Sequence, residues 1–102
     1  MQTVYEGEKR TIECQVKRRR GTGAITLSTP ERRILTALRT VATGFDWAAA
    51  TWNADDEVIS ALFDSTVTAI STPGTYYMQF RGVIGADRPE HEVTIILRDW
   101  GA

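Results

Sequence analysis

A Pro-Gly turn that leads directly into an aromatic run, over residues 72–81, most constrains the fold of this chain. Pro73 presets the φ of the first corner of a turn, and Gly74 accepts a positive φ at the next, so the chain reverses there. Beyond the turn, the side chains of residues 76–80 alternate between the two faces of a strand. A second apolar run, residues 91–98, follows after a polar loop. The two runs predict a β-hairpin late in the chain.

The composition is typical of one globular domain. The chain has 102 residues, of which 42% are hydrophobic and 25% are charged. A chain of this length buries one core, so we expect a single domain over residues 1–102. The net charge of −1 lacks the basic excess of a dedicated nucleic-acid binder. No apolar stretch approaches the roughly 20 residues that cross a bilayer. We therefore expect no specific nucleic acid and no membrane as partners.

Cysteine usage favours a reducing compartment. Cys14 is the only cysteine, which excludes an internal disulfide and a cysteine-based zinc site. Residues 1–8 have neither the basic start nor the apolar stretch of a secretory signal. Both observations favour folding in the cytoplasm.

Several segments have the two-residue periodicity of strands. Residues 11–17 alternate between apolar and polar side chains, which is typical of a strand with one solvated face. A Gly-Thr-Gly sequence at 21–23 ends this strand, and residues 24–28 are expected to form a short return strand. The residues expected to face inward are Ile12, Cys14, Val16, Ile25, Leu27, Tyr76, Met78, Phe80, Val93, Ile95 and Leu97.

Two segments are compatible with either a helix or a strand. For residues 30–41, the Thr-Pro-Glu sequence at 29–31 resembles a helix start. The same residues also alternate as a strand, and the β-favouring threonines and valine of 36–43 favour the strand. Residues 55–63 follow a polar turn that either joins two strands or caps a helix. We expect a strand pair around that turn, and one short helical turn near either segment would fit.

The chain offers no recognisable catalytic constellation. His91 is the sole histidine, and a general base needs an orienting partner and a nearby nucleophile or substrate. We interpret His91 as an exposed residue at the start of a strand. The acidic residues between 46 and 64 match no calcium-loop pattern and fit ordinary turn chemistry. The sequence therefore predicts a protein that is not an enzyme, with no catalytic residue, metal or cofactor.

The candidate interaction residues are basic or aromatic. The four cations of residues 17–20 are interpreted as a solvated loop, and the alternative is an anion or nucleic-acid patch. Either Trp47 or Trp52 is expected in the core, because a tryptophan ring buries a large apolar area. Trp100 is better placed to contact another chain. Tyr77 belongs to the row opposite the core. The possible interaction surface comprises Trp100, Tyr77, Arg18, Arg19 and Arg20.

Residues 72–77 resemble the turn into strand F of immunoglobulin-like sandwiches, which carries a tyrosine corner. Tyr76 matches the corner position. Met78 stands two residues later, where antibody-type domains have a cysteine. The resemblance implies an all-β, immunoglobulin-like antiparallel sandwich of about seven strands, whose sheets are held by packing alone.

Taken at full length, the chain also resembles small phage and prophage tail-associated proteins, including the N-terminal domain of upper baseplate proteins from phages of Gram-positive hosts. The resemblance rests on residues 5–11, 50–53, 60–66 and 73–80. It implies a non-enzymatic structural or assembly module of a virion, whose partners are other virion structural proteins or further copies of itself. It also implies folding in the host cytoplasm before incorporation into the virion. The alternative is an extracellular carbohydrate-binding or adhesion module that uses tryptophans and acidic loops.

Overall fold

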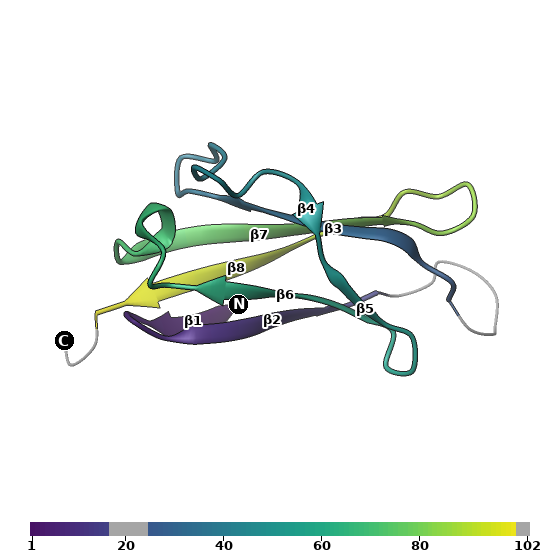
Figure 1. Cartoon of the computed structure of the whole chain (residues 1–102), viewed down its shortest axis with the longest axis horizontal. Coiled ribbons are helices and arrows are strands. Elements are labelled where there is room, and N and C mark those ends of the chain that lie inside the picture. Colours follow the sequence, from purple (N-terminus) through teal and green to yellow (C-terminus); the bar gives the residue numbers. More distant parts are fainter. Residues whose placement is uncertain (17–24, 100–102) are drawn as a thin grey trace.

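The computed structural model describes residues 1–16 and 25–99, which form eight strands and one short 3₁₀ turn. The strands make two facing sheets, and this part of the chain contains no α-helix (Figure 1). The elements are β1 (Gln2–Tyr5), β2 (Lys9–Gln15), β3 (Ser28–Leu35), β4 (Ala48–Ala49), β5 (Thr51–Asn53), β6 (Val58–Asp64), η1 (Thr68–Ile70), β7 (Gly74–Val83) and β8 (Glu90–Arg98).

The strand order is that of an immunoglobulin-like sandwich. One sheet has the order β1-β8-β7-β3-β4 and the other has the order β2-β6-β5. Strands β2, β6 and β5 take the places of B, E and D in an immunoglobulin domain, and β3, β7 and β8 take those of C, F and G. All neighbouring strands are antiparallel except β1, which runs parallel to β8. The expected fold class is confirmed, with two very short strands, β4 and β5, among its elements.

The core lies between the two sheets and is built by the alternation that the sequence predicts. In β7, every second residue from Tyr76 onward is buried. All of the expected inward-facing residues are buried except Cys14 and Val93, which are partly buried and pack against the core. The core is completed by Val4, Ile34, Ala42, Ile59, Phe63 and Ile70.

The late hairpin carries the tyrosine corner. The Tyr76 hydroxyl donates a hydrogen bond to the Thr72 carbonyl at 2.6 Å, and its ring lies 5.6 Å from that of Phe63. Met78 is fully buried. On the opposite sheet, burial raises the pKa of the Cys14 thiol above its usual value. Between the two sheets, packing at these positions takes the place of a disulfide.

The two ambiguous segments contain strands. The helix alternative for residues 30–41 is wrong, and the strand covers only their first part, because β3 ends at Leu35. The Thr36 N–H then bonds to the Thr40 carbonyl, and Arg39 takes a positive φ of 61°, so the chain turns back. The strand pair expected around the polar turn before residues 55–63 is confirmed as β5 and β6. The Asn53 side chain accepts the N–H groups of two residues in the turn between them.

Two further local expectations need correction. The predicted return strand at 24–28 is wrong for residues 25–27, which belong to no strand, since β3 begins at Ser28. Ile25 and Leu27 are nevertheless buried as expected. The short helical turn lies at η1 instead, in the connection from β6 to β7.

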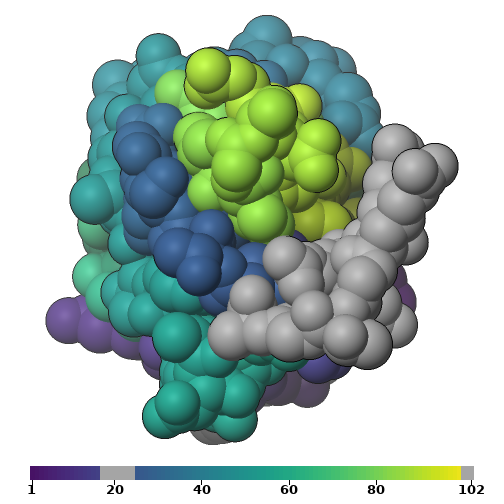
Figure 2. All heavy atoms as spheres, turned by 90° about the vertical axis from the view of Figure 1, so that its right-hand side faces the viewer, coloured from purple at the N-terminus to yellow at the C-terminus, as the bar shows by residue number. Residues whose placement is uncertain are grey.

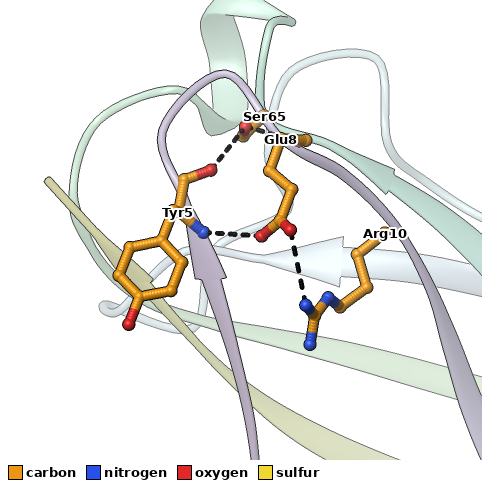
Figure 3. Close-up of polar contacts among 4 residues, drawn as sticks. All are labelled: Tyr5, Glu8, Arg10 and Ser65. Atoms are coloured by element: carbon orange, nitrogen blue, oxygen red, sulfur yellow. Dashed lines mark hydrogen bonds and ion pairs between the residues drawn. The ribbon is translucent and has the colours of Figure 1, made fainter. Parts of the chain in front are cut away.

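Ser65 fastens the turn between β1 and β2 to the end of β6 (Figure 3). It is only 3% exposed. Its hydroxyl lies 2.6 Å from the Glu8 carbonyl and 3.3 Å from that of Tyr5. The Glu8 carboxylate in turn accepts the Tyr5 N–H and pairs with Arg10. These contacts hold β1 at the edge of its sheet and lead the chain into β2 in the other sheet.

A candidate interaction face

The outward-facing row of β3, β7 and β8 carries large polar and aromatic side chains. Its geometry follows from strand register, in which Arg33 lies opposite Gln79 and Gln79 lies opposite Glu92. The Arg33 Nε donates to the Gln79 Oε1 at 2.7 Å, and the Gln79 Nε2 donates to Glu92 at 3.0 Å. A chain of hydrogen bonds therefore crosses three neighbouring strands.

The connection between β3 and β4 adds Arg39 to this row. The Arg39 guanidinium donates to both carboxylate oxygens of Glu92, at 2.8 and 3.1 Å. It also lies over the ring of Tyr77, 4.1 Å from the ring centre. The hydrogen bonds from Arg39, followed by the one from Gln79, hold the pKa of Glu92 below its usual value. The carboxylate is thus ordered and ionised at neutral pH.

Trp47, from the same connection, is covered by two guanidinium groups. The guanidinium of Arg81 lies 3.9 Å from the centre of the Trp47 ring, and that of Arg33 lies 4.7 Å away. Arg81 also donates to Glu31 at 2.9 Å. Stacking of arginine on tryptophan is favourable because the ring face is electron-rich. We call this surface the arginine–aromatic face; it comprises Glu31, Arg33, Arg39, Trp47, Tyr77, Gln79, Arg81 and Glu92.

A second region of interest is the end of the sandwich where residues 54–57 and 84–89 connect strands (Figure 2). A shallow hollow of about 130 Å³ nearby is lined by Gln79, Glu90, His91 and Glu92. The interpretation of His91 as exposed is wrong, because it is half-buried and its Nε2 has no hydrogen-bond partner among the described residues. It faces the core side of β8, opposite Phe80. Within residues 1–16 and 25–99, no three His, Cys, Asp or Glu side chains are grouped to hold a metal ion.

Only part of the predicted interaction surface can be located. Tyr77 lies within the arginine–aromatic face, whereas Trp100, Arg18, Arg19 and Arg20 lie outside the described residues. Of the two central tryptophans, Trp52 packs against the core as expected of one of them. Arg33, Arg39, Arg81 and Glu92 also belong to this face, and none of them was predicted from the sequence. Alternation within β3 and β7 could have indicated Arg33 and Arg81, but the place of Arg39 depends on the turn that follows β3.

Comparison with known proteins gives no family assignment. No protein-family model matches the chain, and no curated protein matches its sequence significantly. In the part of the chain that the structure describes, no helix has the length and apolar character to span a membrane.

Proposed function

We propose that the protein is a non-enzymatic structural or assembly module that docks a protein partner on the arginine–aromatic face. We place this module in a phage or prophage virion, in its tail or baseplate, with another virion structural protein as the partner. The virion setting, and with it assembly in the host cytoplasm, rests on the resemblance carried by residues 73–80 and the other segments. The single free thiol of Cys14 fits that setting.

The observation that carries the proposal is the stacking of Arg33 and Arg81 on Trp47. Arginine, tryptophan and tyrosine dominate the binding energy of protein interfaces. Here they are gathered on one sheet face rather than scattered. The two arginines that stack on Trp47 are also held in place before binding, because Arg33 donates a hydrogen bond to Gln79 and Arg81 donates one to the Glu31 carboxylate. Pre-ordering reduces the entropy that a partner must overcome on docking.

The proposal is tested by co-expressing the protein with the products of its neighbouring genes and measuring the affinity of any complex. Trp47→Ala is expected to weaken binding by about 30-fold or more, which corresponds to the loss of one hot-spot residue. The matched control is Val67→Ala, which trims a side chain that is 39% exposed and lies outside the face. Far-UV circular dichroism checks that each variant is folded. The proposal fails if no neighbouring product binds, or if both variants bind as the wild type does.

The carbohydrate-binding alternative would require a sugar to stack on the ring of Trp47. A sugar that stacks on this ring must compete with guanidinium groups already within 3.9 and 4.7 Å of its centre. A titration of tryptophan fluorescence against a glycan panel separates the two ideas. Saturable quenching that disappears in Trp47→Ala would support the alternative, and flat titrations would remove it.

A further inference from the structure

Strand β2 presents a long, regular edge. It lies at the end of the three-stranded sheet, and among the described residues it forms a ladder only with β6. That ladder is unbroken from Lys9 to Gln15 and contains no bulge. The strand also lacks proline. Bulges, prolines and short length are devices that protect sheet edges from pairing with another chain, and within the described residues β2 has none of them.

Hydrogen bonds on either side of β2 show which backbone groups point outward. The Val16 N–H bonds to the Glu57 carbonyl, and the Ser65 N–H bonds to the Glu8 carbonyl. Even-numbered residues of β2 therefore direct their backbone groups toward β6. Because this direction alternates along an antiparallel strand, the odd-numbered residues of β2 direct their N–H and C=O groups away from β6, and among them are Lys9, Thr11 and Glu13.

The same three residues form an exposed row whose charges are self-complementary. When a second copy of β2 pairs antiparallel with Thr11 opposite Thr11, Lys9 of each copy faces Glu13 of the other. Shifting the register by two in one direction sets Arg10 opposite Arg10. Shifting it by two in the other direction sets Lys9 opposite Gln15, and a shift of four sets Glu13 opposite Glu13. Opposite charges across a strand pair stabilise it and like charges destabilise it, so the charges select one register.

We propose that two copies of the protein associate through antiparallel pairing of their β2 strands, with Thr11 at the two-fold axis. The two three-stranded sheets would become one six-stranded sheet with the order β5-β6-β2-β2-β6-β5. Such a contact is closed and uses the same patch on both copies. It goes beyond the proposed function, because it lies on the other sheet and leaves the arginine–aromatic face free for a different partner.

Charge reversal tests the register directly. Lys9→Glu or Glu13→Lys alone sets like charges opposite each other at both ends of the contact, so each should weaken the homodimer by about 10-fold or more. An equimolar mixture of the two variants restores opposite charges at both ends and should form heterodimers. Asp55→Lys makes the same charge change as Glu13→Lys in the exposed turn between β5 and β6, and should leave the dimer intact. Sedimentation velocity over a series of concentrations gives the dissociation constants.

A cross-link provides a second, independent readout. Opposite residues of a hydrogen-bonded antiparallel pair have Cα atoms about 5.5 Å apart, within the range of a disulfide. Thr11→Cys in a Cys14→Ser background should therefore oxidise to a covalent dimer, whereas Gln15→Cys in the same background should not. A wild-type protein that stays monomeric at every concentration overturns the proposal. So does a dimer that Trp47→Ala abolishes but the charge reversals leave unchanged, because it would form through the arginine–aromatic face.

Discussion

Replacing Tyr76 by phenylalanine isolates the hydrogen bond of the tyrosine corner. The hydroxyl donates to the Thr72 carbonyl at 2.6 Å, and the side chain is only 6% exposed. The substitution keeps the ring and its contact with Phe63, whose centre lies 5.6 Å away. What is lost is therefore one hydrogen bond, and one carbonyl acceptor is left to find another partner.

The expected cost follows from the surroundings of that carbonyl. A typical intramolecular hydrogen bond contributes about 0.5–1.5 kcal/mol, and an acceptor left unpaired in the interior costs about 1–3 kcal/mol. Thr72 is exposed, so water can reach its carbonyl. We therefore expect Tyr76→Phe to lower the free energy of unfolding by about 1 kcal/mol. For a domain of this size, that loss lowers the melting temperature by roughly 4–8 °C.

Urea unfolding followed by tryptophan fluorescence measures the effect, with the slope of the transition expected to stay unchanged. Tyr76→Ala is the comparison variant, because it also removes the ring and should cost about 3–5 kcal/mol. Equal losses in the two variants would refute the reasoning, since the hydroxyl would then carry the whole contribution of the side chain. A Tyr76→Phe variant as stable as the wild type would also refute it, since the hydrogen bond would then contribute nothing to the free energy of unfolding.

Two further predictions concern packing and pH. Gly82→Ala places a Cβ within 2.7 Å of the buried Leu27 side chain, so it should lower the free energy of unfolding by about 1–3 kcal/mol. In a Leu27→Ala background the destabilisation caused by Gly82→Ala should largely vanish. If urea unfolding shows that it persists, the steric explanation is contradicted. Contact with Arg39 lowers the pKa of Glu92 in the folded state from the value of 4.5 of an unperturbed glutamate. The stability that the ionised Glu92 contributes is therefore fully present above the unfolded-state pKa, and it is lost as the pH falls through the folded-state pKa. Glu92→Gln should therefore be less stable than the wild type at neutral pH, with the difference shrinking in acid, and a pH-independent difference in thermal melts would count against the ion pair.

The parts of the fold that depend on local pattern were predictable from the sequence. In β2, β7 and β8 the apolar residues recur every second position, and a strand places such residues on one face wherever it lies in the fold. The tyrosine corner is equally local, since Tyr76 bonds to a carbonyl only four residues earlier. The strand pair at β5 and β6 followed from the Asn53 turn for the same reason.

Elements that depend on competing local preferences were not predictable. The residues that follow β3 are as compatible with a strand pattern as those within it, yet β3 ends at Leu35. The chain turns back there, and the Thr36 N–H bonds to the Thr40 carbonyl. Nothing in the residue types marks this turn, since its left-handed position is occupied by Arg39 rather than glycine or asparagine.

The sequence by itself determined that the described residues form an all-β fold, which side of each main strand is buried, and that the two sheets are joined without an internal disulfide. These properties follow from residue type and two-residue periodicity. Only the tertiary structure decided that β1 lies parallel to β8 and that the connection from β3 to β4 brings Arg39 and Trp47 onto the outward row of β7. It also decided that β2, among the described residues, has one unpaired edge with complementary charges. Each of these depends on which strands become neighbours. That choice is made by the packing of the whole core rather than by any short segment.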